Sequence, residues 1–316
     1  MIKKIIAPLS YRLIKSYRDK HIMPPVDNHA YFSDAVSDPD KAAKIISDVI
    51  TADSPCMISR LGIIELDATL GFRKGAPLSF LRNIYPFWVG EQTKYRLQTN
   101  AGFFPLTNSM MSRFSDLMFS IIPEIDIITI FRAVESIAVK HKCIKIKAPF
   151  LEPFWSTNPW TSQLRNKKIL VVHPFAESIQ KQYDRREQLF ENKDILPEFA
   201  SLTIIKAVQS IGGETNGFNS WFEALLYMEN EIDKVDYDVA LIGCGAYGMP
   251  LAAHCKKMGK KSIHLGGALQ LLFGIRGNRW ENEQDIYKRF MNEHWVRPLD
   301  NERPKTAQNV ENACYW

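Results

Sequence analysis

The chain has 316 residues, of which 46% are hydrophobic and 24% charged, the composition of a globular protein with one large domain or two small ones. It contains no run of about 18 apolar residues, which argues against a membrane-spanning helix, and we expect no signal peptide. Its five cysteines lack Cys-x-x-Cys spacing, which is typical of buried thiols in a reducing compartment. A cytoplasmic location is therefore predicted.

The positive charge is concentrated at the N-terminus. Residues 1–20 carry six Lys or Arg side chains against one Asp, which equals the formal net charge of +5 for the whole chain. The remainder is neutral and lacks the broad basic surface that nucleic-acid binding requires. Residues 1–20, within an N-terminal segment of residues 1–30, are a candidate basic amphipathic helix on an anionic inner membrane. The alternative is a solvated terminus that packs loosely on the body.

Short apolar runs alternate with helical patterns along the rest of the chain. Behind Ser220, a residue type that favours helix N-caps, residues 221–232 place apolar side chains at helical spacing. Continuous apolar strands separated by helices predict an α/β fold, with a Rossmann-like, mainly parallel sheet and helices on both faces. Residues 31–316 are predicted to form a single domain. The predicted strands are residues 56–60, 125–131, 168–173, 202–207, 239–243 and 262–265.

Two aromatic stretches interrupt this alternation. Residues 76–123 are rich in aromatic and turn residues without a sheet period, which predicts a helical insertion. It could form a lid or an acceptor-binding wall, and the alternative is ordinary packing. Residues 149–159 similarly place Phe150, Phe154 and Trp155 between prolines. Aromatic platforms of this kind suit sugar rings.

Residues 238–267 carry the most informative pattern: an apolar strand, a Gly-x-Gly-x-x-Gly turn that begins at Gly243, a helix and a second strand. Such turns bring backbone N–H groups and a helix N-terminus to a diphosphate. A nicotinamide enzyme would place a carboxylate about 20 residues further on. Here the second strand ends at His264, and no carboxylate follows before Glu281. An NAD(P)-dependent oxidoreductase is therefore the second hypothesis, and a tight turn without a ligand also remains open.

Ligands of parallel α/β sheets bind where strands end and helices begin. Arginine, histidine, small hydroxyls and glycine-freed amides at these places would neutralise the charge of a diphosphate leaving group. For Arg60 the alternative is a structural ion pair, and for His173 it is an ordinary hydrogen bond at a strand end. The predicted nucleotide-sugar-binding residues are Arg60, Gly62, His173, Ser178, Arg185, Gly243, Gly245, Tyr247, Gly248, His264, Gly266 and Gly267.

Two segments resemble the GT-D-fold glycosyltransferases, bacterial enzymes that move a sugar from a nucleotide-sugar donor. Arg60-x-Gly62-x-x-Glu65 is similar to the family's Arg-x-Gly-Asp-Gly-Glu signature, and residues 239–267 are similar to its glycine turn between two strands. The likeness spans about residues 45–275. Through short motifs that include residues 314–316 (Cys-Tyr-Trp), the chain also resembles a branch associated with surface polysaccharides such as O-antigen or capsule. The resemblance implies a hexosyltransferase-type enzyme that uses a UDP-sugar and a glycan or lipid-linked glycan acceptor.

One position departs from the family pattern. Ile63 stands where the family has the Asp of an Asp-x-Glu pair linked to a divalent metal, so the resemblance leaves open whether Mn²⁺ or Mg²⁺ is used, with Glu65 as the candidate ligand. Glu65 and Asp67 are the candidate catalytic residues, but on a helix residues two apart point about 200° apart and cannot chelate one ion. Glu65 would order the donor or act as the base on the acceptor hydroxyl. The alternatives are a carboxylate that stabilises a helix N-terminus, and a catalytically inactive homologue that only binds.

Overall fold

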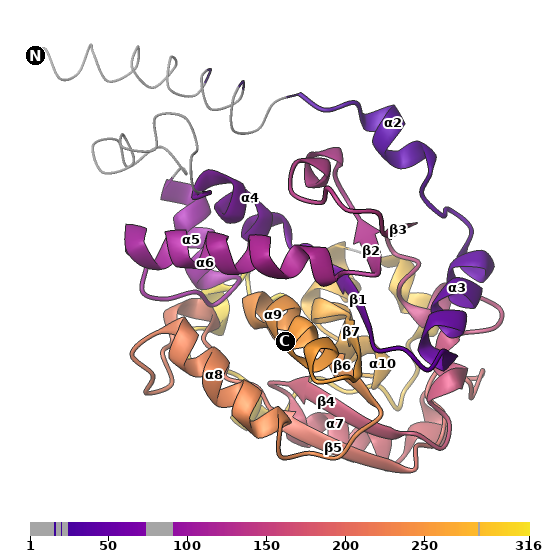
Figure 1. Cartoon of the computed structure of the whole chain (residues 1–316). Helices are drawn as coiled ribbons and strands as arrows, with labels where there is room; N and C mark the ends of the chain where they lie inside the picture. Colours follow the sequence, from indigo (N-terminus) through magenta and orange to yellow (C-terminus); the bar gives the residue numbers. More distant parts are fainter. Residues whose placement is uncertain (1–15, 17–19, 21–24, 74–90, 284) are drawn as a thin grey trace, which may run out of the picture.

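The computed structural model describes residues 16, 20, 25–73, 91–283 and 285–316 (Figure 1). The predicted amphipathic segment, residues 1–20, therefore lies almost wholly outside the described residues, as does the part of the predicted insertion that precedes residue 91. Every helix of the described part of the chain is too short or too polar to cross a bilayer. None of the five cysteines, all of which lie in the described part of the chain, forms a disulfide bond, and four of them are buried, as predicted.

A seven-stranded, all-parallel sheet forms the centre of the molecule, in the order β3-β2-β1-β7-β6-β4-β5 (Figure 1). The predicted Rossmann-like α/β fold is thereby confirmed. Strand β3 was not predicted from the sequence, because this edge strand alternates Ile and Lys instead of forming a continuous apolar run. The strands are β1 (Cys56–Arg60), β2 (Ile127–Ile130), β3 (Ile144–Lys147), β4 (Lys168–His173), β5 (Ser201–Lys206), β6 (Val239–Ile242) and β7 (Lys261–His264).

Helices cover both faces of the sheet and enclose two hydrophobic cores. Side chains of α4, α6, α8 and α9 build the first core, and side chains of α3, α7, α10 and residues 307–316 build the second. Successive residues of β4 alternate between them: Leu170 and Val172 enter the first core, Ile169 and Val171 the second. Because both faces are buried, the strand reads as the continuous apolar run on which the prediction rested. The helices are α2 (Asn28–Ser33), α3 (Pro39–Thr51), α4 (Ile63–Gly71), α5 (Glu91–Thr99), α6 (Asn108–Ile121), α7 (Ala176–Tyr183), α8 (Trp221–Ile232), α9 (Gly248–Lys257) and α10 (Leu269–Leu272).

Side-chain caps fix where several helices begin. Asp38 accepts from the N–H of Lys41 at 2.7 Å at the start of α3, and Thr107 accepts from the N–H of Met110 at 3.2 Å at the start of α6. The predicted N-cap of α8 is confirmed, since Ser220 Oγ accepts from the N–H of Glu223 at 3.2 Å. Each cap satisfies a backbone donor that the helix itself leaves unpaired.

The described part of the predicted insertion is helical and contains α5 and α6. Its aromatic residues belong largely to the first core: Phe103, Phe114 and Trp221 pack ring against ring, with centroids 4.9 to 5.4 Å apart. These contacts fix α6 against α8. Residues 100–102, which follow α5, are consequently held over the carboxyl end of β6, where the glycine turn lies.

The carboxyl ends of the strands share one edge of the sheet. Of the neighbouring strands β4 and β6, the chain leaves β4 toward β5 at the sheet edge and leaves β6 in the opposite direction, toward β7. Such a reversal of direction separates the two connecting loops and opens a crevice in which ligands of α/β proteins bind.

Candidate functional site

A cavity of about 1060 Å³ lies at the carboxyl ends of β1, β2, β4, β6 and β7. Its walls also include residues 148–152, which follow β3, and residues of the C-terminal segment 310–316. The volume lies at the upper end of the range for small-molecule sites, roughly 300 to 1,000 Å³. The predicted site residues that line it are Arg60, Gly62, Glu65, His173, Gly243, Gly245, Tyr247, His264, Gly266 and Gly267.

Arg60, the last residue of β1, places a positive charge in this cavity. Its guanidinium lies 4.6 Å from the centroid of the Phe131 ring, and Nη1 donates to the carbonyl of Leu265 at 3.4 Å. It forms no ion pair with any described carboxylate. The left-handed Gly266, with φ of +60°, packs against its side chain, since a Cβ there would lie 3.3 Å from Arg60 Cδ. The structural ion pair that was one interpretation of Arg60 is thus not seen in the described structure.

Glu65 lies in the first turn of α4 and also lines the cavity. Its carboxylate folds back over Gly62, so closely that a Cβ at residue 62 would overlap with it. Burial raises the pKa of Glu65, while its own backbone N–H and the charge of Arg60 act in the opposite direction. The side chain is therefore placed both to stabilise the helix N-terminus and to exchange a proton with a bound ligand.

Asp67 does not join Glu65. Helix α4 begins at Ile63, so the two carboxylates project to different sides, and Asp67 accepts from Arg132 Nη2 at 2.8 Å outside the cavity. Over the described ranges, no three His, Cys, Asp or Glu side chains come together as a metal site. A single carboxylate does not fit a protein-held divalent ion, for which six or more oxygen ligands are typical of Ca²⁺ and near-octahedral geometry of Mg²⁺.

The three glycines of the turn after β6 each have a packing reason. A Cβ at Gly243 would lie 2.6 Å from the carbonyl of Gly266, and a Cβ at Gly248 would overlap with the His264 ring. Gly245 has φ of +59° and lies under the carbonyl of Ala101, which also accepts from the N–H of residue 246 at 3.0 Å. The pattern therefore serves close packing in addition to any ligand.

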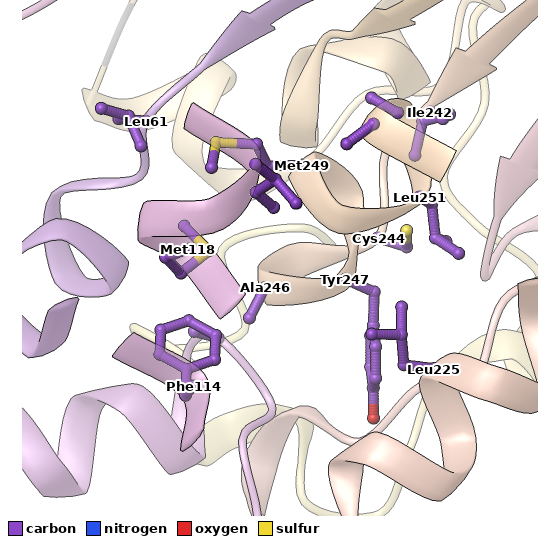
Figure 2. Close-up of a cluster of buried hydrophobic side chains, with 14 of the residues drawn as sticks. Leu61, Phe114, Met118, Leu225, Ile242, Cys244, Ala246, Tyr247, Met249 and Leu251 are labelled. Atoms are coloured by element: carbon purple, nitrogen blue, oxygen red, sulfur yellow. The ribbon is translucent and has the colours of Figure 1, made fainter. Parts of the chain in front are cut away.

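The residues between these glycines face the first core. Figure 2 shows Cys244, Ala246 and Tyr247 among the hydrophobic side chains of this cluster. The Tyr247 ring stacks on Trp221 with centroids 4.9 Å apart, and its hydroxyl lies 2.8 Å from Ser210 Oγ. Tyr247 thus borders the cavity while its polar group is already engaged.

Both histidines at the strand ends are buried and neutral. His173 Nδ1 accepts from the N–H of Phe175 at 3.0 Å, which leaves the ring proton on Nε2. Burial lowers the pKa of His173 to about 3. Burial, together with the charge of Arg60, also lowers the pKa of His264 to about 3, and His264 Nδ1 lies 3.2 Å from Ser59 Oγ. Neither ring can supply positive charge to a phosphate at neutral pH.

Three predicted binding residues, Ser178, Arg185 and Gly248, lie outside the cavity lining. Each of them contacts other groups of the protein instead of facing the cavity. Glu302 accepts from Ser178 Oγ and from the N–H groups of residues 177 and 178 at 2.8 and 3.3 Å, so its carboxylate stands at the N-terminus of α7 where an anion would bind. Arg185 Nε donates to Gln182 Oε1 at 2.6 Å. Gly248 is covered by the His264 ring.

Other cavity residues were assigned no role in the site from the sequence. Glu311, on the C-terminal segment, forms an ion pair with Arg279 and accepts from Asn100 Nδ2 at 2.8 Å, which links that segment to the end of α5. The Arg279 guanidinium lies 4.7 Å from the centroid of the Tyr315 ring, and that ring packs on Gly267, where a Cβ would lie 2.6 Å from it. These residues come together only in the folded chain.

Comparisons of the chain with protein-family models, with curated proteins and with solved structures found no match.

Proposed function

We propose that the protein is a glycosyltransferase that takes the sugar from a nucleotide diphosphate sugar, most simply a UDP-sugar, and transfers it to a hydroxyl of a glycan acceptor. The observation that carries the proposal is Arg60. Its guanidinium forms no direct ion pair with a described carboxylate and lies in a large cavity beside the turn at Gly243. A diphosphate would supply the missing negative charge, and arginine binds phosphate oxygens through paired hydrogen bonds.

Glu65 is the proton acceptor in this proposal. The acceptor hydroxyl oxygen forms the new bond to the anomeric carbon of the donor sugar, and its proton moves to the Glu65 carboxylate. The bond between the anomeric carbon and the diphosphate oxygen breaks, and the leaving diphosphate keeps the electron pair beside Arg60. A pKa raised by burial suits a carboxylate that takes up a proton during the reaction.

An NAD(P)-dependent oxidoreductase has less support. Dinucleotide-binding enzymes place an Asp or Glu at the end of the strand next to the glycine turn, where it binds the ribose hydroxyls. In this protein that strand is β7, which ends at His264, and the imidazole there is neutral. The neutral ring cannot replace the carboxylate as an acceptor of two hydrogen bonds.

The replacement Arg60→Gln tests the proposal. It removes the charge and the paired donors, so we expect UDP to bind at least tenfold more weakly in isothermal titration, since hydrogen bonds to charged groups contribute about 1.5 to 3 kcal/mol. The control Arg165→Gln breaks an exposed ion pair with Asp194, far from the cavity lining, and should leave UDP affinity unchanged. Equal affinities of the wild type and of Arg60→Gln would contradict the proposed role.

A further inference from the structure

The end of the cavity after β3 has a composition of its own. We call it the aromatic end and define it by Thr129, Phe131, Phe150, Glu152, Trp155 and Tyr287, all of which line the cavity. Trp155 and Tyr287 pack edge to face with centroids 5.3 Å apart, so two segments distant in the sequence build one wall. This part of the lining is largely apolar, with the carboxylate of Glu152 and the hydroxyls of Thr129 and Tyr287 as its main polar groups.

The carboxylate of Glu152 is held by neutral groups. Its Oε2 accepts from Trp155 Nε1 at 3.1 Å and from the hydroxyl of Tyr287, and no described cation forms an ion pair with it. The residue is 9% exposed, and burial raises the pKa of its carboxyl group, while the hydrogen bonds from Tyr287 and Trp155 and the charge of Arg60 act in the opposite direction. Burying a carboxylate without a paired cation costs free energy, which further hydrogen-bond donors would offset.

Thr129 gives a second, independent indication. The side chain is 2% exposed, and its Oγ1 has no hydrogen-bond partner among the described residues, although it lines the cavity. In the sheet Thr129 is the registered neighbour of Arg60 on β1. A buried hydroxyl without a partner costs about 1 to 3 kcal/mol, and a ligand with hydroxyl groups would recover part of that cost.

We propose that the aromatic end is a subsite for an uncharged sugar ring, with Glu152 and Thr129 bonding to its hydroxyls. Aromatic side chains pack against the C–H faces of a sugar, and a carboxylate accepts short, strong hydrogen bonds from its hydroxyls. A phosphate group would be repelled by the carboxylate of Glu152, and no described group of three His, Cys, Asp or Glu side chains lies there to hold a divalent cation. The assignment of this subsite to the acceptor sugar rests on the proposed function.

Saturation-transfer NMR with three methyl glycosides, of glucose, galactose and N-acetylglucosamine, tests the subsite directly. The wild type should transfer saturation to at least one of them, with or without UDP. Glu152→Gln keeps an acceptor for Trp155 and Tyr287 but removes the charge, and it should weaken binding about tenfold. Glu302→Gln is the matched control, because Glu302 is also buried and accepts from a hydroxyl, that of Ser178, but does not line the cavity.

Thr129→Val keeps the inference testable if Glu152→Gln does not fold. No hydrogen bond within the described structure is lost and an unpartnered buried hydroxyl is removed, so stability should not fall, while glycoside affinity should fall at least threefold. Absence of saturation transfer from the wild type to any of the three glycosides, or equal glycoside affinity in Thr129→Val and in the wild type, would overturn the inference. UDP titrations of the same proteins test the proposed function separately, because the glycoside measurement does not depend on whether UDP binds.

Discussion

Arg60 and Glu65 lie at one strand-to-helix junction, and their side chains carry opposite charges in different surroundings. The Arg60 charge has a ring and a carbonyl beside it but no described counter-ion, whereas the Glu65 charge is disfavoured by burial. A diphosphate near Arg60 would disfavour the charged form of Glu65 further. Binding of the donor would therefore make Glu65 a stronger proton acceptor.

Glu65→Gln separates proton transfer from donor binding. The amide keeps the size of the side chain but cannot take up a proton, so we expect kcat to fall by about 100-fold to 10,000-fold, with UDP affinity within about twofold of the wild type. The rate of the wild type should rise with pH through the raised pKa of Glu65, because only the deprotonated carboxylate accepts a proton. Asp67→Asn, outside the cavity, should leave the rate unchanged. A Glu65→Gln enzyme that folds and transfers sugar at the normal rate would exclude Glu65 as the base.

His264 should make the protein sensitive to acid. Its pKa is about 3 in the folded state and ordinarily 6.5, so between these values the folded state binds fewer protons than the unfolded state. The free energy of unfolding therefore falls as the pH drops below 6.5, by about 2 kcal/mol between pH 6.5 and 5 for this group alone. In His264→Gln, urea unfolding at pH 7 and pH 5 should show a smaller difference than in the wild type. An equal difference would mean that His264 does not titrate in this way.

The sequence located the residues that belong to the strand ends themselves. Arg60, His173 and Gly243 reach the cavity because parallel strands bring their carboxyl ends to one edge. Ser178 does not reach the cavity, since its partner Glu302 lies 124 residues further on and no local pattern indicates that contact. Glu152 had no assigned role in the sequence, because the strand before it lacks the apolar run by which the other strands were found.

At the scale of whole elements, Gly62 and Gly248 both lie where a helix begins. The side chain that occupies the Cβ position is flexible at Gly62 and fixed at Gly248. Gly62 has φ of −62° and ψ of 139°, which any residue adopts, and only the flexible end of Glu65 occupies its Cβ position. Gly248 is already helical, with φ of −59°, but its Cβ position is filled by the His264 ring, which is buried. The same substitution should therefore act differently at the two helices.

Gly62→Ala should change the free energy of unfolding by less than about 1 kcal/mol while lowering the transfer rate, because Glu65 must move aside. Gly248→Ala should destabilise the fold by about 1 to 3 kcal/mol, since overpacking against His264 outweighs the gain in helix propensity. Urea denaturation of both variants measures these effects. If Gly248→Ala proved more stable than the wild type, the contact between α9 and His264 would be wrong.

At the scale of the whole molecule, the sheet could be predicted from the sequence, whereas the segments that enclose the cavity could not. Apolar runs such as residues 168–173 predict strands buried on both faces, and the order of strands then opens the crevice between β4 and β6. The opposite wall comes from α5 and residues 310–316, which Asn100 and Arg279 join through Glu311. Such contacts over about 200 residues leave no periodic signal in a single sequence.

A thermal-unfolding panel tests the central claim of nucleotide-sugar chemistry most directly. UDP, GDP, dTDP and NAD(P) would each be added with and without Mn²⁺, because a ligand at 100 times its Kd stabilises the fold by about 2.7 kcal/mol. We predict a rise in Tm with one nucleoside diphosphate, UDP first, and a reduced rise in Arg60→Gln. A rise with NAD(P) alone, or no rise with any nucleoside diphosphate, would contradict the proposal.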